Sequence, residues 1–184
     1  PGASAFSEPE TAAIAEFAQQ RNVVAFVDYH SPVNLVLIPY AYTSDPSPHE
    51  ELQWEWAEAM ASAISSTNGV VHDVTKPGMG NPSGGLAQDW FTAELNAISF
   101  TVELRGGPGF NGFELPAEQI VDACAENWAG FVELAERTSD AFGEDPPDGG
   151  ETGNPGESSG GGEAETSDGD PDSAGEGPMT SASS

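Results

Sequence analysis

The sequence predicts an α/β fold, with a mixed, mostly parallel sheet sandwiched between helices. Three short apolar stretches are typical of buried strands: 22–29 (NVVAFVDY), 34–38 (NLVLI) and 97–104 (AISFTVEL). Segments of helical periodicity separate and flank them, and such alternation favours a layered α/β arrangement. Three strands would leave the sheet with uncovered edges, so the predicted fold is incomplete.

Three helices complete this prediction. The first covers residues 7–20 and begins with a capping box, in which Ser7 is the N-cap and Glu10 lies three residues further on. The second and third are the amphipathic stretches 49–65 and 117–142, whose apolar residues recur at helical spacing.

The chain is strongly acidic. Its 184 residues include 31 Asp and Glu against four Lys and Arg, a net charge of −27. Residues 143–184 hold 11 of these acids and 11 Gly but no Lys, Arg or aromatic residue, which predicts a disordered acidic tail. The remaining 20 acids and all four basic residues leave the folded part, 1–142, at about −16.

A folded part this acidic, with Lys76 as its one lysine, is typical of a halophilic protein. At molar salt the Debye length is about 3 Å, so self-repulsion is screened. An acidic protein from an organism of ordinary salinity is the alternative. The charge excludes nucleic acid and anionic membranes as partners, because binding them requires clusters of Lys and Arg.

Other classes are excluded by simple counts. The longest apolar runs fall far short of the roughly 20 residues of a membrane span, and the single Cys124 excludes an internal disulfide. The chain opens at Pro1 without a signal segment, which we interpret as processing or truncation. The sequence does not determine the location of the protein, although an extracellular or cell-surface site would suit a halophile's peptidase.

Three places along the chain carry residues capable of chemistry. His30 follows a predicted strand, where sites form in open α/β sheets, and is either a ligand, an acid/base group or structural. Glu103 lies near the end of the third strand and either has a function or forms an ion pair with Arg105. The pair Asp89-Trp90 is interpreted as part of a site or as a helix N-cap with a packing aromatic.

Four segments, in this order, resemble the zinc metallocarboxypeptidases of the carboxypeptidase A type. They are PGASAFSEPET (1–11), VDYHSPVNLVLIPY (27–40), GGLAQDW (84–90) and SFTVELRGGPGFNGFELP (99–116). The resemblance runs to about Arg137. It implies that residues 1–142 are the C-terminal part of a catalytic domain with a partial carboxypeptidase-like α/β/α fold. Because of the acidic composition, we expect the source to be a halophilic archaeon.

The resemblance also implies roles for single residues. His30 is similar to the family's third zinc ligand, and Glu103 to the general base that takes a proton from zinc-bound water and returns it to the leaving amine. Further positions resemble those that line the site and the pocket for the terminal side chain: Ser31, Leu37, Ala41, Gln88 and Thr101. Gln88 is neither apolar nor acidic, so the preferred terminal residue stays open.

Two departures from the family pattern stand out. The HxxE motif that supplies the first two zinc ligands is absent from this sequence, as are the arginines that bind the substrate's carboxylate. In the mobile loop, Asn81 occupies the position of the family's tyrosine. One histidine cannot hold catalytic zinc, which needs about three protein ligands.

We therefore interpret the chain as a fragment of a zinc carboxypeptidase, an enzyme that uses one zinc ion to hydrolyse the C-terminal peptide bond of peptides or proteins. Its partner would be the missing N-terminal half of the catalytic domain, and the isolated chain is expected to be inactive. Two alternatives stay open: a degenerate, non-catalytic binding module, and a related zinc deacylase of N-acyl amino acids.

Overall fold

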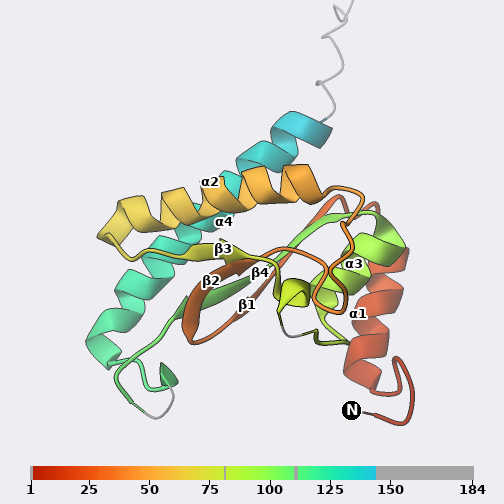
Figure 1. The fold of residues 1–184 in the computed structure, drawn as a ribbon, viewed down its shortest axis with the longest axis horizontal. Helices are drawn as coiled ribbons and strands as arrows, with labels where there is room; N and C mark the ends of the chain where they lie inside the picture. The colour runs from red at the N-terminus through yellow and green to blue at the C-terminus, as the bar shows by residue number, and fades with distance from the viewer. Residues whose placement is uncertain (1, 81, 110–111, 144–184) are drawn as a thin grey trace, which may run out of the picture. The chain divides into compact units, whose positions relative to one another are not determined.

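A four-stranded sheet forms the centre of the computed structural model, which describes residues 2–80, 82–109 and 112–143. Within these ranges the strand order is β1-β4-β2-β3. β1 is parallel to β4 and β2 to β3, whereas β2 and β4 are antiparallel. The predicted mixed, mostly parallel sheet is thus confirmed (Figure 1). The strands are β1 (Ala25–His30), β2 (Val33–Leu37), β3 (Asp73–Thr75) and β4 (Ile98–Arg105).

Helices cover both faces of this sheet (Figure 1). On one face α2 and α4 pack closely against each other, and on the other α1 and α3 lie toward the first residues of β1 and β4. The helices are α1 (Pro9–Gln19), α2 (Glu50–Asn68), α3 (Ala87–Leu95) and α4 (Ile120–Phe142), with short 3-10 turns η1 (Pro77–Met79) and η3 (Ala117–Gln119).

The alternation of side chains along the strands separates an apolar face from a polar one. Val36, Phe100 and Val102 are fully buried in the core beneath α2 and α4. On the opposite face Phe26 stacks on Phe91 of α3, with ring centroids 3.8 Å apart. Beyond this stack the same face is polar, and it carries the candidate site.

The start of α1 differs from the prediction. The N-cap is Glu8, and Ser7 Oγ lies 2.9 Å from a Glu8 carboxylate oxygen instead of binding a helix amide. Pro9 explains the difference, because a proline fits best at the first helical position and so makes the residue before it the N-cap. The prediction of Ser7 as N-cap is wrong.

Two elements and one burial pattern were not predicted. β3 has only three residues, which is too few to show an alternating pattern. For α3 the sequence offered only a possible N-cap at Asp89, without a predicted helix. Asp89 lies instead within the first turn of α3, after Leu86 as N-cap. β1 was expected to be buried on both faces, yet its last residues, Tyr29 and His30, are exposed, because β1 is an end strand of the described sheet.

The predicted acidic tail lies, apart from Gly143, outside the described residues. Among the helices of the described part, none combines the length and the apolar character needed to cross a bilayer.

The crossing of α2 and α4 depends on Gly130. A Cβ placed on Gly130 would lie 2.9 Å from Ile64 Cγ1, closer than side chains tolerate. We therefore expect Gly130→Leu to lower the free energy of unfolding by about 1–3 kcal/mol, since it overpacks this contact. Urea denaturation in high salt measures the loss. The exposed Ala125→Leu on the same helix is the control, and equal losses in both variants would contradict the prediction.

Candidate active site

The candidate site is built on the carboxyl ends of two parallel strands. His30 ends β1, and Glu103 lies directly opposite it in β4, as its partner in the strand register. Asp28 and Thr101 face each other in the same way, two residues earlier. Because residues two apart in a strand share a face, all four side chains lie on the polar face of the sheet. The two residues singled out in the sequence are thus brought together.

Asp28 connects these groups. One of its carboxylate oxygens lies 3.3 Å from His30 Nε2, and the other accepts a hydrogen bond from the Thr101 hydroxyl. A neutral imidazole that donates through Nε2 keeps an unprotonated Nδ1, which can bind a metal. Thr101 is buried and fixes the carboxylate, whereas the His30 side chain is 57% exposed and therefore accessible.

The carboxyl of Glu103 lies in a setting that favours its protonated form. Burial raises its pKa above the ordinary value of 4.5, the nearby His30 opposes this rise, and the negative charge of Asp28 adds to it. Its Oε2 is buried without a hydrogen-bond partner among the described residues. A carboxyl whose pKa is moved toward neutrality is suited to accept and return a proton.

The described residues do not form a zinc site by themselves. No group of three or more His, Cys, Asp or Glu side chains in the described part of the chain is arranged to hold a metal ion. His49 contacts Asn96 through a 2.9 Å hydrogen bond, and His72 is buried away from solvent. His30 with its Asp28 partner fits a single ligand of a metal centre, and further ligands would have to come from elsewhere.

The buried wall of the site is formed by two neighbouring strands. Leu37 in β2 is the register partner of Thr101 in β4, so both lie on the polar face one step from Glu103. Both are buried. Ser31, by contrast, is exposed directly after β1. Asn81 lies outside the described residues.

The loop after β2 is held on α3 by Asp89. The amide of Ala41 donates to both carboxylate oxygens of Asp89, each at 3.0 Å. Burial raises the pKa of Asp89, and these amide hydrogen bonds oppose the rise. The adjacent Gln88 is fully buried, and its backbone carbonyl accepts a hydrogen bond from the Ser99 hydroxyl of β4. Ala41 and Gln88 are therefore fixed above the same face of the sheet.

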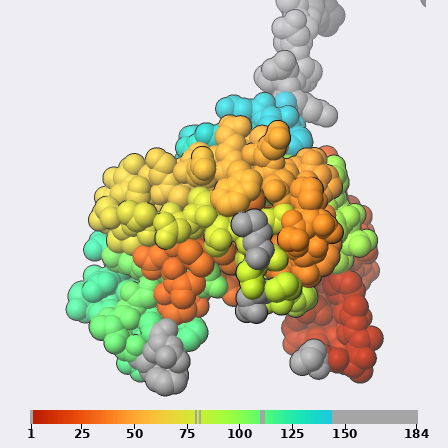
Figure 2. Space-filling model, in the orientation of Figure 1, coloured from red at the N-terminus to blue at the C-terminus, as the bar shows by residue number. Residues whose placement is uncertain are grey.

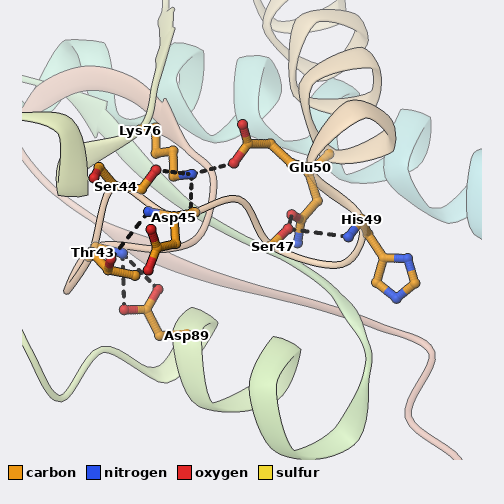
Figure 3. Close-up of polar contacts among 10 residues, drawn as sticks. Thr43, Ser44, Asp45, Ser47, His49, Glu50, Lys76 and Asp89 are labelled. Carbon is orange, nitrogen blue, oxygen red and sulfur yellow. Dashed lines mark hydrogen bonds and ion pairs between the residues drawn. The ribbon is translucent and has the colours of Figure 1, made fainter.

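Lys76 fixes the other end of this loop (Figure 3). Its side chain is 2% exposed, and its ammonium donates to the carbonyls of Ser44 and Asp45, at 3.3 and 2.7 Å, and to the Glu50 carboxylate. Three acceptors match the three N–H donors of an ammonium group. Lys76 thus joins the loop after β2, the start of α2 and the chain after β3.

Arg105 does not form the ion pair with Glu103 that the sequence suggested. Its guanidinium turns to α4, 3.4 Å from Glu126, and donates to the Gln119 carbonyl at 2.8 Å. The alternative of an ion pair between Glu103 and Arg105 is therefore wrong, because the buried carboxylate of Glu126 attracts Arg105 instead. Glu103 is left free of an arginine partner among the described residues.

The other basic residues are also occupied. Arg137 binds Glu133 at 2.7 Å and Glu55 at 2.9 Å, and Arg21 lies over the ring of Phe17.

Sequence reasoning overlooked two of these residues. Asp28 was quoted beside His30 but was not identified as its partner, although the two-residue spacing along a strand places both on one face. Lys76 was noted only as the one lysine. Its anchoring role depends on carbonyls from a distant loop, which carry no signal in the sequence.

Comparison with known proteins identifies the class to which this fold and site belong. The zinc carboxypeptidase family matches residues 1–130, and the chain belongs to that family. Mouse carboxypeptidase A1 is 34% identical over 139 residues, and zinc carboxypeptidase A 1 of Anopheles gambiae is 33% identical over 148. The alignments cover 72% and 75% of this chain but only 32% and 33% of the relatives. The chain thus spans about a third of the length of these relatives.

Solved structures agree on the fold. The carboxypeptidase A of Helicoverpa armigera superimposes with a TM-score of 0.66 at 26% identity, covering 78% of this chain and 37% of that structure. Bovine thrombin-activatable fibrinolysis inhibitor, solved with a tick carboxypeptidase inhibitor, gives a TM-score of 0.68 at 24% identity, covering 77% and 49%.

The electrostatic coupling between Glu103 and His30 gives a testable pH dependence. We expect the pKa of Glu103 to lie above 4.5 and to rise further in His30→Gln, because His30 is the group that lowers it. Because folding raises the pKa of Glu103, the folded protein holds this proton more tightly than the unfolded chain does. The stability that this proton contributes is therefore lost as the pH rises through the pKa that Glu103 has in the folded state. Carboxyl titration by NMR measures the shift. His49→Gln is the control, and an unchanged pKa in His30→Gln would refute the coupling.

The anchoring role of Lys76 is tested by removing its charge. Lys76→Met leaves two carbonyls and the Glu50 carboxylate without their donor, so we expect a loss of about 1–3 kcal/mol in the free energy of unfolding. Arg21→Met removes the same charge from the exposed Arg21 and should change stability by about 0.5 kcal/mol or less. Similar urea midpoints for the two variants would argue against the anchor.

Proposed function

We propose that residues 1–142 are the C-terminal part of a zinc carboxypeptidase catalytic domain, which hydrolyses the C-terminal peptide bond of peptides or proteins. The observation that carries this proposal is the pairing of Glu103 with His30 across β4 and β1. Membership of the zinc carboxypeptidase family supports it. Residues 143–184 are then an acidic tail outside this domain.

In this proposal Glu103 is the catalytic base and acid. It accepts the proton of the attacking water and donates it to the leaving amine, which suits a carboxyl whose pKa burial raises. His30 is one ligand of the zinc ion, and Asp28 holds its ring through Nε2.

The pocket for the terminal side chain would lie beside Glu103 on the same face. The register pair Leu37–Thr101 supports this, as does the fixing of Ala41 by the Asp89 carboxylate. Gln88 contributes a neutral side-chain amide, whose nitrogen and oxygen are buried without a regular hydrogen bond among the described residues. This amide lies close to Asp89 and lowers the pKa of the Asp89 carboxyl. Ser31 and Asn81 are proposed to contact the substrate.

The remaining zinc ligands and the cation for the substrate's carboxylate would come from the missing N-terminal half of the domain. The described residues form no group of three metal-ligating side chains, and three of their four Lys and Arg side chains are held in ion pairs. The 1–184 chain alone is therefore inactive in this proposal.

The acidic surface is proposed to reflect a halophilic source, which we take to be archaeal. At the net charge of −27, screening by molar salt would relieve repulsion between carboxylates. Assays of function therefore belong in molar KCl, with a low-salt series alongside.

Activity tests the proposal. The chain joined to its in-frame upstream coding sequence should bind one zinc ion and release the last residue of a C-terminal blocked dipeptide in a chelator-sensitive reaction. Glu103→Gln should lower kcat by roughly 10²–10⁴-fold, because it removes the proton acceptor. The exposed Glu94→Gln should not change kcat.

Three outcomes would contradict this function. Activity of the 1–184 chain by itself would show that the upstream half is not needed. Absence of zinc and activity in the joined protein would favour a non-catalytic binding module. Cleavage of N-acyl amino acids in preference to blocked dipeptides would favour a deacylase.

A further inference from the structure

Arg105 turns away from the proposed catalytic carboxyl. Residues two apart in a strand share a face, so Arg105, the last residue of β4, is placed to reach Glu103. Its guanidinium instead lies against α4, 3.4 Å from a Glu126 carboxylate oxygen, and donates to the Gln119 carbonyl at 2.8 Å. The exposed Asp122 lies further away, at 4.0 Å. Only 13% of the Arg105 side chain is exposed, so these contacts fix its orientation.

Glu126 is the buried partner in this contact. It is fully buried in α4, and neither of its carboxylate oxygens has a regular hydrogen bond among the described residues. Within this part of the chain, the ion pair with Arg105 balances its charge. Burying two charges costs about as much as their attraction returns, so such a pair is weak evidence of a stabilising role. Directing the guanidinium is a role that accounts better for a carboxylate at this place.

His72 faces the same carboxylate but does not compete for it. Its imidazole is buried, and both ring nitrogens lack a regular hydrogen bond among the described residues. Burial lowers the pKa of His72, whereas the nearby backbone of Val70 and the charge of Glu126 oppose this effect. The ring is therefore neutral near pH 7, and the negative charge of Glu126 is left to Arg105.

A released Arg105 would block the proposed base. Guanidinium groups bind carboxylates through two parallel hydrogen bonds. Glu103 has no arginine partner among the described residues, and its Oε2 is buried without a hydrogen bond there. An arginine bound to Glu103 would occupy the oxygens that a base must present to water, so the two side chains have to be kept apart.

We propose that Glu126 is a positioning residue: it holds the guanidinium of Arg105 against α4 and thereby keeps it away from the Glu103 carboxyl. Figure 2 shows the segment at the start of α4 (green) on one side of a hollow and α1 (red) on the other. Arg105 ties this segment to the sheet through the Gln119 carbonyl, and Glu126 sets its direction. The importance for catalysis rests on the proposed function, in which Glu103 is the base.

A purely structural link between α4 and β4 is the competing explanation. If the ion pair only fastened the helix to the strand, loss of either partner would weaken the protein and its activity alike. If Glu126 restrains a cation that blocks Glu103, loss of Glu126 releases this cation, whereas loss of Arg105 removes it. The two explanations therefore differ in whether the two single variants behave alike.

Kinetics of the joined protein, which includes the in-frame upstream coding sequence, test this difference in molar KCl. Glu126→Gln should lower kcat by about tenfold or more with KM changed by less than about twofold, because the released Arg105 binds the base. Arg105→Gln, and the double variant that carries both changes, should keep kcat within about threefold of the unchanged protein. Urea denaturation measures the stability of each variant separately. The double variant buries no charge at this contact, so its folding does not depend on the pair.

Asp122→Asn is the matched control. Asp122 is 60% exposed on the same helix, 4.0 Å from Arg105, so its replacement should leave kcat unchanged. The proposal is overturned by equal losses of kcat in Glu126→Gln and Arg105→Gln, by an unchanged kcat in Glu126→Gln, or by a double variant no more active than Glu126→Gln. If Glu126→Gln does not fold, Arg105→Gln decides, since a structural link requires it to lose activity.

NMR on the 1–184 chain separates this inference from the proposed function. In Glu126→Gln, nuclear Overhauser effects of the Arg105 guanidinium protons with Gln119 should disappear, and effects with the Glu103 side chain should appear. Asp122→Asn should show neither change. An inactive joined protein with this movement of Arg105 would refute the proposed function and keep the inference. An active joined protein in which Arg105 stays on α4 in Glu126→Gln would refute the inference and keep the function.

Discussion

The position of β4 in the sheet is the constraint on which the rest of the structure depends. Hydrogen bonding to β1 on one side and β2 on the other fixes the register of its side chains. One face must then be apolar, since Phe100 and Val102 lie beneath α2 and α4. The alternate residues Thr101 and Glu103 are thereby directed to the other face, where they face Asp28 and His30 of β1.

The sequence predicts what depends on local pattern. Apolar runs predicted three of the four strands, and helical periodicity predicted α1, α2 and α4. It could not predict features set by distant contacts. Arg105 binds Glu126 because α4 folds back over the end of β4, and Pro9 moves the N-cap from Ser7 to Glu8. The role of Asp28 required the register between β1 and β4.

The candidate site lies at the end of the described sheet. His30 belongs both to the polar face that holds Glu103 and to the strand whose outer edge is open. The His30 imidazole is therefore 57% exposed, although its neighbour Asp28 is held by Thr101.

Lys76 gives the folded chain an unusual chemical property. It is the one lysine among 184 residues, and its amine is enclosed by two carbonyls and a carboxylate. An amine-acylating reagent can reach this nitrogen only when the loop after β2 separates from the start of α2. The rate of acylation at Lys76, read by mass spectrometry, therefore reports how often the wall of the candidate pocket opens.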